Sequence, residues 1–199
     1  MSKNNKTLNV IKFLPILYIV VAIIGLVVAY WLTYDKIHIL KYPNYKPICD
    51  INPIISCGDV MNAKQSNLFG VPNPIFGLVG FSMLLAFGLA LLGGAKLKRW
   101  LWLVINGGAA AGFLFFVYLF SQGVFVIHAI CPFCFVIWMI TPPVFWYTTM
   151  YNLQEGNIKV KAKVKDWLIK HHGEILLLWY VAVFMVLLIK FWYYWKTII

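Results

Sequence analysis

Long apolar runs separated by polar segments are the main feature of this chain. A run of about 18 or more apolar residues is needed to cross the roughly 30 Å of hydrocarbon in a bilayer. Five runs fit this description, at about residues 13–31, 75–92, 100–120, 131–151 and 175–195. They predict an all-α integral membrane protein with five transmembrane helices. Because little chain remains between them, we expect a single membrane domain over residues 1–199.

The composition agrees with this interpretation. Hydrophobic residues make up 62% of the chain and charged residues 12%, whereas soluble domains are about half apolar. The first apolar run is longer than the roughly 7–15 residues typical of a secretory signal. We therefore expect it to remain in the protein as the first helix.

The positive charges are distributed unevenly between the two sides of the predicted helices. The net charge is +11, and Lys and Arg in short loops favour the cytoplasmic side of a membrane. This predicts a cytoplasmic N-terminus and an extracytoplasmic C-terminus, with the basic run 159–165 against anionic lipid. This orientation explains the positive net charge, so we do not expect nucleic acid as a partner. Eleven basic residues fall on the predicted inner side (Lys3, Lys6, Lys12, Lys96, Lys98, Arg99, Lys159, Lys161, Lys163, Lys165, Lys170) and five on the outer side (Lys36, Lys41, Lys46, Lys64, Lys196).

That orientation brings all four cysteines to the outer face. Cys49 and Cys57 lie in a predicted outer loop of about residues 33–72, and Cys131 and Cys134 lie at the start of the fourth predicted helix. Disulfides form and persist outside the cytoplasm. Residues 58–69 of the loop have apolar positions at helical spacing, which predicts a short amphipathic helix covering the outer helix ends.

The sequence Cys131-Pro-Phe-Cys134 has the features of a reactive thiol pair. Residues three apart lie on one helix face, within reach of a disulfide, and proline suits the first helical position. A cysteine at a helix N-terminus is stabilised as thiolate, which is the nucleophile in disulfide exchange. We expect Cys131, at the mouth of the helix, to be the more exposed member. A static disulfide is the alternative, but across one helical turn it would constrain very little.

The loop pair, Cys49 and Cys57, is ambiguous by itself. Asn52-Pro53 favours a turn that brings these cysteines together, but closing so short a loop stabilises a protein little. A structural and a redox disulfide therefore both fit, and the neighbouring Cys-x-x-Cys favours redox. A zinc site of four thiolates commonly has two close cysteine pairs. Only one pair here has that spacing, so we expect no metal.

Electrons that leave a thiol pair at the membrane need an acceptor, and the lipid phase supplies quinones. A quinone requires an apolar pocket and a hydrogen-bond donor for its carbonyl oxygen. Asn73 is polar and lies at the predicted level of the Cys-x-x-Cys pair. A helix N-cap is its alternative function, and packing or interfacial positions are the alternative for the aromatic residues. The candidate quinone-binding residues are Met61, Asn73, Phe76 and Trp138.

In combination, these residues resemble the vitamin K epoxide reductase family. The resemblance extends over about residues 10–150 and depends on Cys49-Asp50, Cys57, Asn73-Pro-Ile-Phe-Gly77 and Cys131-Pro-Phe-Cys134. It implies a four-helix membrane bundle around a quinone, capped by the outer loop. The fifth helix is similar to the extra helix of bacterial homologues, which implies the cytoplasmic membrane of a bacterium or archaeon. Those homologues often continue into a fused thioredoxin-like domain, so the resemblance implies a separate thioredoxin-like partner here.

The resemblance also implies a function for each cysteine. Cys131 and Cys134 correspond to the active-site pair, with Cys134 facing the quinone. Cys49 and Cys57 correspond to the shuttle pair, with Cys57 exchanging with Cys131, and Asn73 corresponds to the asparagine that hydrogen-bonds the quinone.

Two positions differ from the pattern of many relatives. Ala63 replaces a serine or threonine, and Trp138 replaces a tyrosine of many animal relatives. Both hydroxyl groups are therefore missing. Because epoxide reduction needs a protonating group, this favours quinone reduction over epoxide reduction.

We therefore expect a membrane thiol–disulfide oxidoreductase that takes electrons from its thioredoxin-like partner. Both cysteine pairs would pass the electrons to ubiquinone or menaquinone, which supports disulfide formation outside the cytoplasm. One alternative is a vitamin K quinone or epoxide reductase of the animal type. The other is a non-enzymatic membrane protein with structural disulfides.

Overall fold

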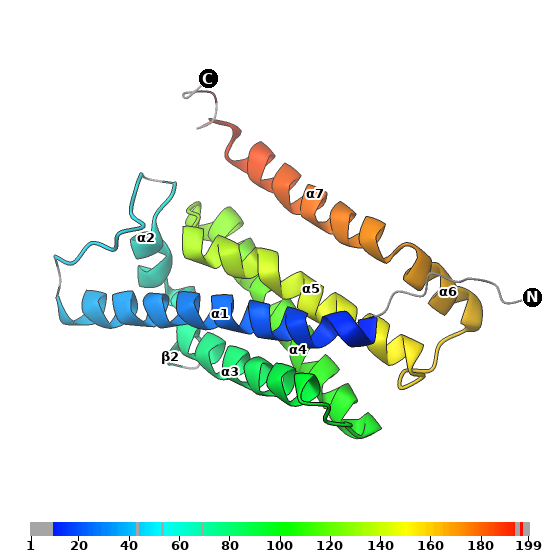
Figure 1. The fold of residues 1–199 in the computed structure, drawn as a ribbon. Helices are drawn as coiled ribbons and strands as arrows, with labels where there is room; N and C mark the ends of the chain where they lie inside the picture. The colour runs from blue at the N-terminus through cyan, green and yellow to red at the C-terminus, as the bar shows by residue number, and fades with distance from the viewer. Residues whose placement is uncertain (1–9, 43, 53, 69, 194–195, 197–199) are drawn as a thin grey trace, which may run out of the picture.

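The protein is built almost entirely from helices (Figure 1). The structure is a computed structural model that describes residues 10–42, 44–52, 54–68, 70–193 and 196. The α-helices are α1 (Val10–Lys41), α2 (Cys57–Asn62), α3 (Asn73–Leu92), α4 (Arg99–Ser121), α5 (Pro132–Gln154), α6 (Ala162–Lys170) and α7 (His172–Lys190). A 3₁₀ turn η1 (Lys64–Ser66), strands β1 (Asn67–Leu68) and β2 (Val71–Pro72) and a π-helix η2 (Gln122–Ile127) complete the described elements.

Five of these helices are long and apolar enough to cross a membrane, as the sequence predicted. They are Phe13–Lys41 of α1, α3, α4 continued through η2 to Ile127, α5 and α7. The predicted all-α membrane fold is therefore confirmed. The predicted end of the first helix near residue 31 was wrong, because α1 continues to Lys41 and the outer loop is correspondingly shorter. The predicted end of the last helix at residue 195 lies outside the described residues.

Four of the spanning helices, α1, α3, α4 and α5, form a bundle, and α1 lies between α5 and α3 in the view of Figure 1. α1 packs against both α3 and α5, and α5 packs against α4. α3 can approach α1 closely because Gly88 has no side chain: a Cβ there would lie 2.9 Å from Cγ1 of Ile19. Small residues permit such close helix contacts in membranes. α3 and α4 make few direct contacts with each other, which leaves this side of the bundle loosely closed.

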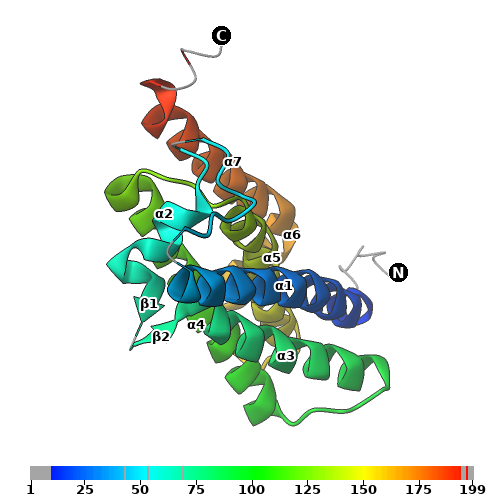
Figure 2. The same cartoon turned by 90° about the vertical axis from the view of Figure 1, so that its left-hand side faces the viewer.

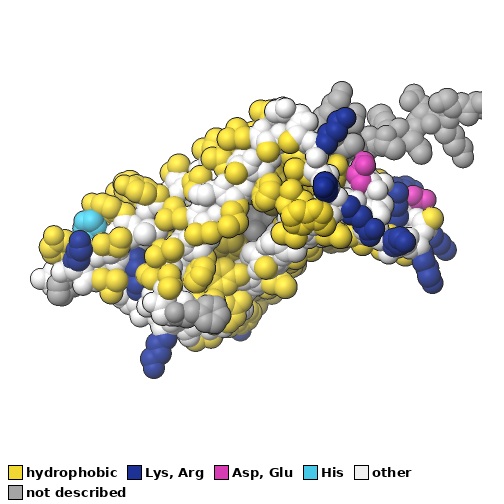
Figure 3. Space-filling model, turned by 90° about the horizontal axis from the view of Figure 1, so that it is seen from below, with side chains coloured by type: hydrophobic (Ala, Val, Ile, Leu, Met, Phe, Trp, Pro, Cys, Tyr) yellow, Lys and Arg dark blue, Asp and Glu magenta, His cyan; other side chains and the backbone are white. Residues whose placement is uncertain are grey.

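α7 lies outside the bundle and packs on α5 and η2. A second hydrophobic cluster at this contact includes Val124, Val183, Leu187 and Phe191. α6 lies between α5 and α7 at the end where α1 begins (Figure 1). Lys and Arg side chains gather at this end, whereas the middle of the molecule is largely hydrophobic (Figure 3).

The opposite end carries the outer loop, which Figure 2 shows facing the viewer. The helix predicted at residues 58–69 was wrong beyond Asn62, because Ala63 has extended backbone angles (φ −64°, ψ 146°) that end α2 after six residues. η1 and the antiparallel pair β1–β2 follow. Gly70 lies in the turn between the strands at φ 78°, a conformation that favours glycine. Phe69, in the predicted helix, lies outside the described residues.

Candidate functional site

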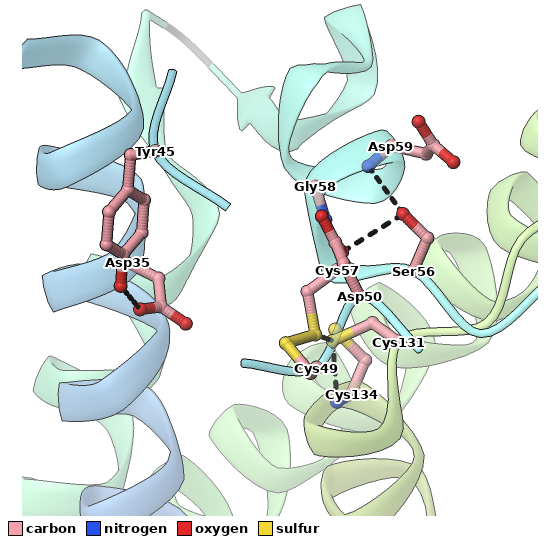
Figure 4. Close-up of a disulfide and its surroundings, with 10 residues drawn as sticks. All are labelled: Asp35, Tyr45, Cys49, Asp50, Ser56, Cys57, Gly58, Asp59, Cys131 and Cys134. Atoms are coloured by element: carbon pink, nitrogen blue, oxygen red, sulfur yellow. Dashed lines mark hydrogen bonds between the residues drawn. A yellow bond between two sulfur atoms is a disulfide. The ribbon is translucent and has the colours of Figure 1, made fainter. Parts of the chain in front are cut away.

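The four cysteines meet where the outer loop covers the start of α5 (Figure 4). Cys49 and Cys57 form a disulfide with their Cα atoms 5.6 Å apart, and Cys131 and Cys134 are free thiols. Cys49, Cys57 and Cys131 belong to the same hydrophobic core cluster as residues of α1 and α5. The loop that carries the disulfide is therefore packed as part of the protein interior.

Side-chain hydrogen bonds fix the fold of the loop around the disulfide. Oδ1 of Asp50 accepts hydrogen bonds from the backbone N–H of Gly58 (2.7 Å) and from Oγ of Ser56 (3.1 Å). Oγ of Ser56 in turn accepts from the backbone N–H of Asp59 (3.0 Å), which makes Ser56 the N-cap of α2. Asp50 and Ser56 are favoured at such positions because their short side chains reach nearby backbone N–H groups. Cys57 is thus held as the first residue of α2.

A short parallel β-bridge ties this loop to the segment before α5. Ile55 pairs with Ile130. The N–H of Ile130 donates to the carbonyl of Ile54 (2.7 Å), and the N–H of Ser56 donates to the carbonyl of Ile130 (3.2 Å). Cys131 directly follows Ile130, and Cys57 follows Ile55 by two residues, so the bridge brings the two cysteines together: their Sγ atoms are 3.1 Å apart.

Cys131 is the N-cap of α5, and Pro132 is the first residue of this helix, where we expected it. The N–H of Cys134 points to Sγ of Cys131 at 3.4 Å. A hydrogen bond from the Cys134 thiol and the N–H groups of Cys134 and Phe133 lower the pKa of Cys131, although burial and the charge of Asp35 oppose them. The geometry therefore favours a thiolate at Cys131, the sulfur that touches the loop disulfide.

The expected exposure of the thiol pair was wrong. Cys131 is only 1% exposed, because the outer loop covers it, whereas Cys134 is partly exposed. The exposed face of Cys134 lines a cavity rather than the outer surface. The two thiols therefore have different surroundings: Cys131 contacts the loop disulfide, whereas Cys134 borders the cavity without contacting the disulfide.

The cavity has a volume of about 90 Å³ and lies between the outer loop and the bundle. Its wall is overwhelmingly apolar. Both Cys131 and Cys134 border it, as do Met61, Asn73 and Trp138 among the predicted quinone-binding residues. The other lining residues are Ala29, Leu32, Val60, Gln65, Ser66, Pro74, Gly77, Phe81, Phe115, Phe116, Leu119, Gln122, Ile127 and Ile137.

Phe76 does not border this cavity. It is 39% exposed and lines a larger groove of about 460 Å³ beside α3 and α4, where its ring meets that of Phe115 edge to face. Gly77, Phe81, Phe115 and Phe116 line both spaces, so the groove and the cavity are neighbours. The groove lies at the side of the bundle where α3 and α4 make few contacts.

Asn73 is the first residue of α3 and holds the loop that covers the cavity. Its Oδ1 accepts from the N–H of Leu68 (3.0 Å), and its Nδ2 donates to the carbonyl of Gln65 (2.7 Å). The alternative function as N-cap was wrong, because Pro72 occupies that position. An amide nitrogen has two hydrogens, and Gln65 accepts one of them.

Sequence reasoning missed a second anchor of the loop, Lys36. This lysine is 4% exposed, and its ammonium donates to the carbonyl of Met61 and to Oγ of Ser66. Because residue 36 was assigned to the loop, its position on the buried face of α1 was not foreseen. In the part of the chain that the structure describes, no three His, Cys, Asp or Glu side chains are grouped to hold a metal ion.

Five membrane-spanning helices, a packed disulfide and a thiol pair at a helix start define a membrane-embedded thiol redox protein. The sequence model of the vitamin K epoxide reductase family matches residues 16–149, which include α2, α3, α4, all four cysteines and most of α1 and α5. The chain belongs to this family and is an oxidoreductase. A search of the curated proteins found no match.

Proposed function

We propose that this protein passes electrons from an extracytoplasmic thioredoxin-like protein to a membrane quinone and thereby supports disulfide formation. The single observation that supports this most directly is the 3.1 Å contact between Sγ of Cys57 and Sγ of Cys131. It joins a disulfide and a thiol pair in one buried cluster. Thiol–disulfide exchange requires a thiolate to reach a disulfide sulfur.

The first steps transfer electrons between the cysteine pairs. A dithiol on the partner reduces the Cys49–Cys57 disulfide and is itself oxidised. The Cys57 thiolate then attacks Sγ of Cys131 in an oxidised Cys131–Cys134 pair, which forms the Cys57–Cys131 bond and releases Cys134 as thiolate. Cys49 attacks Cys57, restores the loop disulfide and releases Cys131. Two electrons have then moved to Cys131 and Cys134.

The last step returns the thiol pair to its disulfide. Cys131 and Cys134 give up two electrons and two protons, their disulfide forms, and a quinone is reduced to the quinol. Cys134 is the thiol we assign to the quinone, because it borders the cavity and does not contact the loop disulfide. The free thiols and intact loop disulfide correspond to the state immediately before this step.

The residues around the cavity fit a quinone. Apolar and aromatic side chains, Trp138 among them, suit the ring, and the remaining hydrogen on Nδ2 of Asn73 suits a carbonyl oxygen. The adjoining groove suits an apolar tail, and we assign Phe76 to that groove. It also supplies a route from the lipid at the loosely closed side between α3 and α4.

We propose that the chain is a single membrane domain with its N-terminus in the cytoplasm. The basic residues of α6 and its flanks gather at the end where α1 begins, which supports this orientation (Figure 3). The outer loop and all four cysteines would then be extracytoplasmic, as would the partner. The electron acceptor that we propose is ubiquinone or menaquinone.

The test is quinone reduction by the purified protein with a reduced thioredoxin-like protein as donor. We expect quinol to form in proportion to donor disulfide. Vitamin K epoxide, offered in parallel, would be reduced faster than quinone if the animal-type activity were the correct one. Thiol trapping during turnover addresses the non-enzymatic alternative, because structural disulfides would not cycle. Absence of quinol formation with both quinones would refute the proposal.

A further inference from the structure

The middle of α5 contains two consecutive prolines, Pro142 and Pro143. In an α-helix the N–H of each residue donates to the carbonyl of the residue four positions earlier, and proline has no N–H. The carbonyl groups of Trp138 and Met139 therefore lose their usual helical donors. Inside a membrane a freed carbonyl needs a donor from elsewhere in the protein, because the hydrocarbon contains no water to supply one.

A tyrosine of α7 supplies the donor for one of these two carbonyls. The hydroxyl of Tyr180 donates a hydrogen bond of 2.6 Å to the carbonyl of Met139. This is the carbonyl that the N–H of residue 143 would bond if that residue were not proline. Tyr180 therefore replaces a missing backbone hydrogen bond of α5 with one from a side chain of another helix.

The two prolines divide α5 into two parts, and the first part carries the chemistry. Residues 132–141 follow Cys131, and they contribute Cys134, Ile137 and Trp138 to the wall of the cavity. Because two backbone hydrogen bonds are missing at the prolines, the helix alone fixes the orientation of this first part less firmly than an unbroken helix would. The orientation of the thiol pair therefore depends on what else the first part contacts.

α7 contacts α5 on both sides of the prolines. Before the prolines, the ring of Phe184 meets that of Phe135 edge to face, with the ring centroids 5.9 Å apart, and Phe135 directly follows Cys134. After the prolines, Nε1 of Trp146 donates to the carbonyl of His172, the first residue of α7 (2.9 Å). α7 thus connects the two parts of α5 across the break between them.

α7 also reaches the segments that bring the cysteines together. Val183 and Phe191 form a buried cluster with Ile54 of the outer loop. Ile130 packs against this cluster and donates its N–H to the carbonyl of Ile54 (2.7 Å). Because Cys131 directly follows Ile130, the first part of α5 is tied to α7 at both of its ends.

We propose that Tyr180 is a positioning residue for the thiol pair. Through its hydrogen bond to Met139, it holds the first part of α5 so that Cys131 stays against the loop disulfide. Tyr180 is not among the described residues that line the cavity, so it acts through the backbone of α5 and not on the quinone. The inference rests on the proposed function only in that Cys131 and Cys134 are the reacting pair.

The experiment measures how fast iodoacetamide alkylates Cys131 in the purified protein at constant pH, with the loop disulfide intact. Cys131 is only 1% exposed, so alkylation requires the first part of α5 to move away from the loop. Tyr180→Phe keeps the ring and removes only the hydroxyl. It should raise the rate about threefold to tenfold, as expected for the loss of one hydrogen bond between membrane helices. Peptide mass spectrometry separates Cys131 from Cys134.

A second substitution tests which carbonyl is involved. Pro143→Ala, added to Tyr180→Phe, supplies an N–H that can donate to the carbonyl of Met139, so the rate should return close to that of the wild type. Pro142→Ala, added to Tyr180→Phe, supplies an N–H for the carbonyl of Trp138 instead and should leave the rate raised. A general strengthening of α5 would act alike in both variants, so the difference between them identifies the Met139 carbonyl.

Tyr147→Phe is the matched control. The hydroxyl of Tyr147 lies 3.4 Å from Nδ1 of His172, a contact between α5 and α7 that lies after the prolines, so its loss should leave Cys131 protected. An unchanged rate in Tyr180→Phe, an equal rise in Tyr147→Phe, or a raised rate that Pro143→Ala lowers no more than Pro142→Ala does would overturn the proposal. If the proline variants do not fold, the comparison of Tyr180→Phe with Tyr147→Phe decides. Alkylation needs neither quinone nor partner, so this inference and the proposed function can fail separately.

Discussion

Replacing Cys49 and Cys134 together by alanine should trap Cys57 and Cys131 in a disulfide with each other. Their Sγ atoms are 3.1 Å apart, and a disulfide is about 2.05 Å long, so the sulfurs need to approach by only about 1 Å. The bridge between Ile55 and Ile130 already holds both segments in place. No thiol remains to resolve the bond, so under mild oxidation we expect it in nearly all molecules.

The trapped bond should also change stability measurably. It joins residues separated by 74 positions, and closing a loop of that length is expected to raise the free energy of unfolding by about 4 kcal/mol over the reduced form. The native Cys49–Cys57 disulfide joins residues only 8 positions apart. Its contribution to the free energy of unfolding should therefore be about 2 kcal/mol smaller than that of the trapped bond. Adding reductant should therefore lower the melting temperature of the trapped variant more than that of the wild type.

Two other double variants serve as controls in the same assay. Cys57→Ala/Cys134→Ala leaves Cys49 with Cys131, and Cys49→Ala/Cys131→Ala leaves Cys57 with Cys134. Neither pair has the sulfur contact found between Cys57 and Cys131, so both should cross-link more slowly. Mass spectrometry of non-reduced peptides identifies the bonds. The relay order is wrong if Cys57 and Cys131 both stay free, or if either control pair closes as fast.

Three further predictions concern the quinone step, the loop and the orientation. Cys134→Ala should abolish quinone reduction while leaving the protein folded, and near-normal quinol formation would remove Cys134 from the role assigned to it. Gly58→Ala should slow thiol–disulfide exchange and destabilise the protein by about 1–3 kcal/mol, because a Cβ there would lie 2.6 Å from Oδ2 of Asp50. Gly80→Ala is its control: the new Cβ meets nothing within 4 Å and should add up to about 1 kcal/mol of stability, so equal losses in both variants would contradict the argument. A reporter fused to the C-terminus should be extracytoplasmic, and a cytoplasmic signal would reverse the assigned orientation.

The membrane helices were predictable because hydropathy is a local property of the chain. Runs of apolar residues predicted the five spans, and the proline after Cys131 predicted the start of α5. The end of α1 was not predictable in this way, because Asp35 and Lys36 interrupt the apolar pattern although both side chains are buried. Their burial depends on the loop that packs against them, which a sequence window does not contain.

The contacts within the candidate site were less accessible from the sequence. The spacing of the cysteines suggested two pairs, but the burial of Cys131 depends on the β-bridge between Ile55 and Ile130, two segments far apart in the chain. Phe76 lines the neighbouring groove and not the cavity, which depends on how the helices pack and not on the local sequence. The π-helix η2, which brings Gln122 and Ile127 to the cavity wall, had no recognisable signal.

The length of α1 gives the described part of the outer loop a surface to pack against. Its 32 residues extend about 48 Å at about 1.5 Å per residue, which exceeds the roughly 30 Å of hydrocarbon by about three turns. The loop packs against this additional part of α1. There, Lys36 of α1 donates a hydrogen bond to the carbonyl of Met61, and Asp35 of α1 accepts one from the hydroxyl of Tyr45. The contact between Cys57 and Cys131 is therefore already present in this structure. Cys49 is only 5% exposed, so the step that requires movement is the approach of the partner thiol to the loop disulfide.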